Sequence, residues 1–402
     1  MSLACPDCGT LLDIPPLQRG ASAVCPVCDN TLERTGGRSI SVALACALTT
    51  FILLLPANLL PFLGVSMLGM HRETQLGSGV ISLWNEHWVV VAGMVAAFVI
   101  VLPFVRFALL STVLICVRFG GRPPWLGRAF RWAMALDLWA MPDVFLLGSA
   151  VGYSRVEANL PVAIGLGGYA FIGAAFLAML SRATLDQRTV WRAITPEREP
   201  PEGEEPVISC TACDLVVPAS VEHSHCPRCA ARLYARKPET KRITVALAIA
   251  GLALYFPANT YPMSLTVQLG EDVPRRIIDG IRDLADAHLW PLAALVFCTS
   301  IAIPFLKLIS LLWFVISIRL RSSRGLLFRT KLYRVIDEIG RWSYVDVYTI
   351  AVFVPLLQFG AIASTRAMTA ITPFAIVVAL TMVASRIFDP RLMWDAARPS
   401  SP

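Results

Sequence analysis

Eight long runs of apolar residues constrain this chain more than any other feature of its sequence. A helix of about 20 apolar residues is long enough to cross a lipid bilayer. The runs lie near residues 41–63, 88–117, 133–152, 160–181, 243–263, 289–318, 343–363 and 368–387. Hydrophobic residues make up 56% of the chain and charged residues only 16%, which excludes one large soluble domain. The sequence predicts an all-α polytopic membrane protein with eight transmembrane helices.

The basic residues between the runs predict the orientation of the chain. Cytoplasmic connections of membrane proteins retain Lys and Arg. In a chain that crosses eight times, the N-terminus, the C-terminus and the connections after the second, fourth and sixth runs lie on the same side of the membrane. These segments together hold most of the 35 Lys and Arg residues. We therefore expect both termini to be cytoplasmic. The net charge of +7 then reflects membrane topology rather than nucleic-acid binding.

The chain is built from two copies of one unit. At an offset of about 200 residues, Pro56-Ala57-Asn58 recurs as Pro257-Ala258-Asn259, and Trp139-x-x-x-Asp143 recurs as Trp342-x-x-x-Asp346. Each copy consists of a cysteine-rich module and four of the predicted helices. Because an even number of helices returns the chain to its starting side, the two copies form a parallel repeat.

Eight of the 11 cysteines form four Cys-x-x-Cys pairs, with two pairs ahead of each set of helices. The pairs are Cys5 and Cys8, Cys25 and Cys28, Cys210 and Cys213, and Cys226 and Cys229. Two such pairs can supply four thiolates to one tetrahedral metal ion, which predicts two zinc ribbons. A closed shell of four ligands indicates a structural zinc. Rubredoxin-like iron with a redox role is the alternative, since iron also accepts tetrahedral sulfur sites.

These features divide the chain into five parts. The expected boundaries are 1–38 for zinc ribbon 1, 39–195 for transmembrane repeat 1, 196–206 for a linker, 207–240 for zinc ribbon 2, and 241–397 for transmembrane repeat 2.

Two basic residues, Arg106 and Lys307, fall deep inside apolar runs, where an unpaired charge costs about 2.5–3.5 kcal/mol. The next predicted helix of each repeat carries Asp143 or Asp346. Asp143 and Asp346 each lie twelve residues from the basic residue at the cytoplasmic end of their helix. Arg106 and Lys307 lie at the same distance from the cytoplasmic ends of their own helices. We therefore expect the ion pairs Arg106–Asp143 and Lys307–Asp346. Such pairs either lock two helices together or form a polar network that couples transport to helix movement.

Two hydroxyl side chains are candidate members of the same transport network. Ser300 lies two helical turns before Lys307 on the same face, and Thr381 lies on the last predicted helix. Lys307 is the expected switch, because a buried lysine loses its proton far more readily than an arginine does.

Two further segments, 64–87 and 265–288, are expected outside the cytoplasm and mix apolar with charged residues. They predict either amphipathic helices on the membrane surface or a platform for a partner.

No nucleotide-binding or hydrolase motif occurs in the chain, so we do not expect an enzyme.

The order of the duplicated motifs, closing with Phe388-Asp389-Pro390-Arg391, resembles the paraquat-inducible protein A family of bacterial inner-membrane proteins. That resemblance implies phospholipid transport between the two membranes, together with a periplasmic MCE-domain tunnel protein. The residues alone also fit a redox or stress-response membrane protein with iron sites, or a transporter of small solutes or ions.

Overall fold

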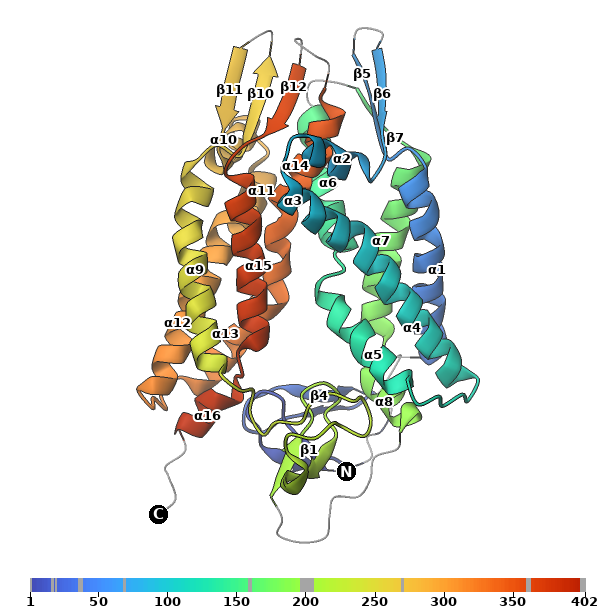
Figure 1. The fold of residues 1–402 in the computed structure, drawn as a ribbon, viewed down its shortest axis with the longest axis vertical. Coiled ribbons are helices and arrows are strands. Elements are labelled where there is room, and N and C mark those ends of the chain that lie inside the picture. Colours follow the sequence, from blue (N-terminus) through green and yellow to red (C-terminus); the bar gives the residue numbers. More distant parts are fainter. Residues whose placement is uncertain are drawn as a thin grey trace.

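The computed structural model describes residues 2–15, 18, 20–34, 39–67, 70–157, 161–195, 206–268, 271–358 and 363–397. Two groups of helices lie side by side along the long axis of the molecule (Figure 1). Both cysteine modules lie at one end, which we call the module end, and two small β-sheets lie at the other, the sheet end (Figure 1). The two repeats therefore run in the same direction. Of the predicted linker 196–206, only Pro206 lies within the described residues.

The helices of the first repeat follow the predicted apolar runs. They are α1 (Ile40–Leu59), α3 (Val89–Val95), the π-helical turn η1 (Ala96–Val101), α4 (Leu102–Arg118), α5 (Leu126–Ala135), the 3₁₀ turn η2 (Leu136–Leu138), α6 (Pro142–Glu157), α7 (Leu166–Thr184) and α8 (Gln187–Ile194). The helix α1 packs along α7 and α4. Pro142 stands at a helix start, where a missing backbone N–H removes no intrahelical hydrogen bond. Pro103 lies inside the continuous helical stretch Val89–Arg118, directly after the π-helical turn η1.

The second repeat has the same order of elements. They are α9 (Thr240–Thr260), α11 (Trp290–Phe297), the π-helical turn η4 (Cys298–Ala302), α12 (Ile303–Arg319), α13 (Leu326–Ile339), the 3₁₀ turn η5 (Gly340–Tyr344), α14 (Val345–Leu356), α15 (Ile371–Ile387) and α16 (Arg391–Ala397). In both repeats a π-helical turn comes just before the Pro-Phe pair. The duplication seen in the sequence is thus a duplication of structure.

Helices long and apolar enough to cross a membrane number six among the described residues. A seventh is reached if α15 and α16, which are bent by 52° at Phe388–Pro390, count as one span. The region 343–363, predicted to be a full span, contains the helix α14 of only 12 residues. A multi-pass membrane protein is confirmed, and the count of eight stays a prediction.

The sheet end contains strands where amphipathic helices were one prediction. The strands are β5 (Leu63–Met67), β6 (Met70–Thr74) and β7 (Val162–Ile164) in the first repeat, and β10 (Ser264–Gln268), β11 (Glu271–Arg275) and β12 (Ala363–Ala367) in the second. Each hairpin pairs with a third strand that lies about 100 residues further along the chain. Helices form only in the later part of each segment, as α2 (Ser78–Asn85) and α10 (Ile277–Asp286). The prediction of helices was therefore wrong for the first half of each segment.

Each cysteine module places apolar side chains against the repeat that it does not precede. Leu3 and Leu32 of the first module pack with Trp394, which lies in α16 of the second repeat. The second module places Ile208 and Val217 in one apolar cluster with α5 and α8 of the first repeat. The two modules also touch, because the strand β1 (Ser2–Ala4) lies beside β8 (Val207–Ser209) and β9 (Val216–Pro218). The apolar contacts of the modules are thus exchanged between the repeats, while the ion pairs Glu33–Arg192 and Arg236–Asp395 join each module to the repeat that follows it.

The contact between the second module and α5 requires a glycine. A Cβ atom on Gly127 would lie 1.8 Å from the carbonyl oxygen of Arg228, which cannot move away as a flexible side chain would. We expect Gly127→Ala to lower the free energy of unfolding by about 1–3 kcal/mol through overpacking. Thermal unfolding in detergent would measure the change. The matched control is Gly93→Ala in α3, where the new methyl group meets open space; equal unfolding temperatures for the two variants would contradict this contact.

Candidate metal centres and intramembrane charge network

Each Cys-x-x-Cys pair sits on a short hairpin whose turn aims both sulfur atoms inward. The backbone N–H of the first cysteine donates to a carbonyl five residues ahead, as from Cys5 to Thr10 at 2.9 Å and from Cys226 to Ala231 at 2.7 Å. The residue after the second cysteine adopts positive φ in all four turns; these residues are Gly9, Asp29, Asp214 and Ala230. The Cys-x-x-Cys spacing thus folds into one repeated turn.

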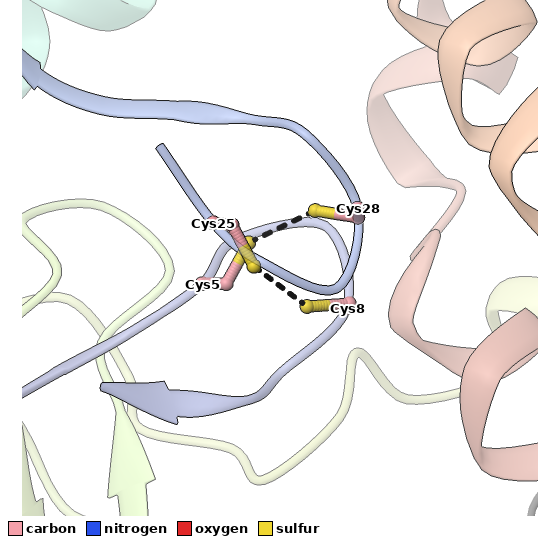
Figure 2. Close-up of side chains that lie close together, drawn as sticks. All are labelled: Cys5, Cys8, Cys25 and Cys28. Carbon is pink, nitrogen blue, oxygen red and sulfur yellow. Dashed lines mark hydrogen bonds between the residues drawn. The ribbon is translucent and has the colours of Figure 1, made fainter. Parts of the chain in front are cut away.

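The eight cysteines form the two clusters that the sequence predicted. Within each cluster the four Sγ atoms lie within 4.8 Å of one another, and all eight cysteines are buried. In the first cluster the sulfur atoms point toward a common centre, with Cys5 and Cys28 at 3.4 Å and Cys8 and Cys25 at 3.6 Å (Figure 2). Sulfur atoms on a tetrahedral zinc ion with bonds of about 2.3 Å are about 3.8 Å apart. The donor set and its size therefore fit a four-coordinate metal ion.

A helix of the second repeat supplies the surroundings of the first cluster. Arg334 on α13 donates from Nη2 to the carbonyl oxygen of Cys28 at 2.7 Å and to its Sγ at 3.3 Å. Its Nε donates to Asp7 at 2.6 Å. Burial raises the pKa of Asp7, and the charge of Arg334 opposes that shift. Lys331 makes a second ion pair with Asp29 at 2.9 Å, at the surface.

The buried charge of the first repeat has a different partner from the predicted one. Arg106 is 1% exposed and forms its ion pair with Asp137 in η2. Asp143 instead accepts from Nη1 of Arg182 at 2.9 Å, and Nε of Arg182 donates to Asp137 at 2.7 Å. The predicted pair Arg106–Asp143 was wrong, although all four residues belong to one continuous network.

A break in the third helix explains this difference. Between η2 and α6, residues 139–141 interrupt the helix, so the regular helical spacing on which the Arg106–Asp143 pair was predicted does not continue to Asp143. Nη2 of Arg182 donates to the freed carbonyl oxygens of Asp137 and Ala140, both at 3.1 Å. Sequence reasoning missed Asp137 and Arg182. The signal available was Pro142, which marks the start of a new helix within the apolar run.

The buried charge of the second repeat also differs from prediction. Lys307, on α12, is 1% exposed. Among the ion pairs of the described residues, none joins Lys307 to Asp346, which lies buried in the first turn of α14. The ammonium group lies against Gly340, where a Cβ atom would come within 2.1 Å of Nζ. Gly340 occupies the position in the second repeat that Asp137 occupies in the first. At this position the first repeat has the carboxylate that pairs with Arg106, whereas the second repeat has a glycine that leaves room for the side chain of Lys307.

The two repeats meet through polar contacts in the middle of the molecule. Arg341 of η5 reaches Asp143 of the first repeat, with 3.6 Å between Nη2 and Oδ2. Thr349 on α14 donates to the carbonyl oxygen of Gly148 on α6 at 3.1 Å. The charge network of the first repeat is therefore connected to the second repeat.

Ser300 and Thr381 are both buried, as expected of network members. Ser300 lies in the π-helical turn η4, with its Oγ 3.4 Å from Oγ1 of Thr299. Thr381 donates to the carbonyl oxygen of Val378 in its own helix at 2.8 Å. Their role in transport stays a prediction.

Known proteins are similar to the chain over nearly its whole length. The "Intermembrane transport protein PqiA" of Escherichia coli strain K12 is 30% identical over 98% of this chain and 95% of its own length. The "Lipophilic envelope-spanning tunnel protein A" of the same strain is 28% identical over 98% of this chain and 91% of its own. A "Probable intermembrane transport protein" of Haemophilus influenzae is 26% identical over 98% and 95%.

No solved structure matches the chain. The family described as "Paraquat-inducible protein A" matches twice, over residues 40–195 and 242–398. These two matches cover the two helical repeats and leave out both cysteine modules. With the duplicated fold and the full-length similarity, they show that this chain belongs to the paraquat-inducible protein A family.

Proposed function

We propose that this protein is an integral inner-membrane component of an intermembrane lipid transport system. It passes phospholipid between the inner membrane and a tunnel formed by a periplasmic MCE-domain protein. The observation that carries this proposal is the full-length similarity to proteins named for intermembrane transport and for an envelope-spanning tunnel.

The buried charges support a route for a polar headgroup. Arg106, Arg182, Asp137 and Asp143 lie in the membrane-spanning part of the first repeat, where charged groups are rare and serve function. Nε and Nη1 of Arg106 and Oδ1 of Asp143 have no hydrogen-bond partner among the described residues. Buried polar groups in native proteins are nearly always hydrogen-bonded. These atoms offer donors and an acceptor to a headgroup or to water that accompanies it.

The proposal includes a complete topology. Eight spans place both termini and both cysteine modules in the cytoplasm, and the sheet end faces the periplasmic partner. The domains are the zinc ribbons 1–38 and 207–240 and the repeats 39–195 and 241–397, joined by the linker 196–206. The basic connections support this orientation.

The cysteine clusters hold two structural zinc ions in this proposal. Cys5, Cys8, Cys25 and Cys28 would hold the first ion, and the second cluster would hold the other. Each ion would supply the folding energy that a module of this size lacks, since so few residues bury little apolar surface. Metal analysis with a visible spectrum tests this directly: two zinc ions in a colourless protein support it, and a reducible iron chromophore would favour the redox function.

Lys307 and Asp346 provide the functional test. We expect Lys307→Ala and Asp346→Ala each to abolish complementation of an envelope-defect phenotype, because each removes a buried charge that we propose to govern lipid movement. The protein should remain folded and abundant, as measured by immunoblotting of membranes. Lys241→Ala, which removes an exposed lysine at the start of α9, should complement normally. Normal complementation by both network variants would overturn the role given to these residues.

The partner and the cargo have a separate test. The protein purified from membranes should carry an MCE-domain protein with it, together with phospholipid that mass spectrometry identifies. A protein that transports a small solute and brings neither would count against the proposal.

A further inference from the structure

One arginine of the second repeat touches both cysteine pairs of the first module. Arg334 donates to Sγ of Cys28, which belongs to the second pair, and to Asp7, which lies between the cysteines of the first pair. It also donates to the carbonyl oxygen of Cys28 at 2.7 Å. A hydrogen bond to a ligating sulfur orients the ligand and stabilises its negative charge. Four thiolates around a divalent ion carry excess negative charge, which an arginine offsets.

The same helix continues from this module to the intramembrane charges. Asp337 lies one turn beyond Arg334 on α13, and the turn η5 follows directly at the end of that helix. Gly340 lies against the ammonium group of Lys307, and Arg341 reaches Asp143 of the first repeat. A shift of α13 relative to the first module therefore moves both of these contacts of the buried charges together.

The first repeat lacks this connection. Arg131 corresponds to Arg334 in the duplication, and its guanidinium lies over the ring of Trp132, 5.8 Å from the ring centroid. The second module meets α5 by backbone packing of Arg228 on Gly127. Within the described residues, the hydrogen bonds from a transmembrane repeat to a cluster sulfur come from Arg334 alone.

We propose that Arg334 is a positioning residue that couples metal binding in the first cysteine module to the placement of α13 and η5. This rests on the metal binding proposed above and adds a regulatory role for one of the two ions. With the metal bound, the two cysteine pairs are held together and Arg334 anchors the module end of α13. Without the metal, the pairs separate and the anchor is lost, so the contacts around Lys307 loosen.

The first test measures metal release from the purified full-length protein. The chelator 4-(2-pyridylazo)resorcinol reports each released ion by its colour. We expect Arg334→Gln to release one of the two ions about 10–100-fold faster than the unaltered protein, the usual effect of losing an outer-shell partner. Arg131→Gln, the matched change in the first repeat, should leave both rates unaltered. Arg334→Lys keeps the charge without the planar fork and should fall between the two.

The second test measures amide hydrogen exchange in α13 and η5, which reports how well their backbone hydrogen bonds are protected. Chelation should raise exchange over residues 326–344 in the unaltered protein, and Arg334→Gln should show that raised exchange before chelation. Replacing Cys5 and Cys28 by serine should have the same effect on 326–344, although these cysteines precede the first repeat. Residues 126–138 should respond instead to loss of Cys226 and Cys229.

The outcomes separate the coupling from the metal binding on which it rests. Two bound ions with unaltered release rates in both Arg334 variants would overturn the coupling alone. Two bound ions with unaltered exchange over 326–344 after chelation would also overturn it. A purified protein that holds no metal, even after incubation with zinc, would overturn both proposals.

Discussion

Replacing Cys226 and Cys229 by serine is expected to cost this protein most of its folded population. The two thiolates are half of the second cluster, and structural zinc contributes about 10–16 kcal/mol of apparent binding free energy in small modules. The same module covers apolar side chains of the first repeat, among them Phe130 and Trp191, whose rings pack at 4.7 Å. Loss of the module therefore exposes part of a transmembrane repeat that precedes it in sequence.

Size-exclusion chromatography in detergent, with metal analysis of the folded peak, measures this effect. We expect a large drop in the folded peak and a metal content reduced from two ions to one. Cys298→Ser is the matched control, because Cys298 is exposed and belongs to neither cluster. A double variant that elutes and unfolds like the unaltered protein would show that the second cluster has no structural role.

Replacing Asp137 by alanine is the second change with a large expected effect. Asp137 accepts from both Arg106 and Arg182, so its loss leaves two guanidinium groups with one nearby carboxylate, Asp143. Removing one partner of a fully buried ion pair costs about 3–5 kcal/mol, and this is an upper bound here because the Asp137 side chain is 32% exposed while Arg106 is 1% exposed. We expect a lower unfolding temperature and a smaller yield of folded protein.

A compensating variant separates the charge from the side-chain volume. Arg106→Met combined with Asp137→Leu removes a cation and an anion together, and an apolar pair of this kind is often neutral for stability. The double variant should therefore unfold at a higher temperature than Asp137→Ala. Asp286→Ala, at the exposed end of α10, is the control for loss of a carboxylate. Equal unfolding temperatures for Asp137→Ala and Asp286→Ala would show that the ion pairs of Asp137 with Arg106 and Arg182 do not stabilise the protein.

The features set by short sequence patterns could be predicted well. A Cys-x-x-Cys pair needs only one tight turn to aim two sulfur atoms inward, so both clusters were found from spacing. The duplication was visible because motifs such as Trp139 to Asp143 recur in order. Apolar length predicted six of the helices, since a bilayer fixes how many apolar residues a helix needs.

The pairing of the buried charges could not be predicted in the same way. Counting residues along a helix gives depth only if the helix is unbroken, and residues 139–141 break it. Arg182 then fills the gap from a helix that comes about 40 residues later. The strands β7 and β12 were missed for a related reason, because their partners β5 and β10 lie far away in sequence. Neither contact leaves a local signal.

The exchange of the cysteine modules has a consequence for how such a chain arises. A unit with one module and four helices, folded alone, would leave its own module without the apolar helix faces that it packs on. Two separate copies would each place their module on the other, which is a domain-swapped homodimer with twofold symmetry. Joining the copies end to end converts that dimer into a single chain. The halves are then free to diverge, and the difference between Asp137 beside Arg106 and Gly340 beside Lys307 is one such divergence.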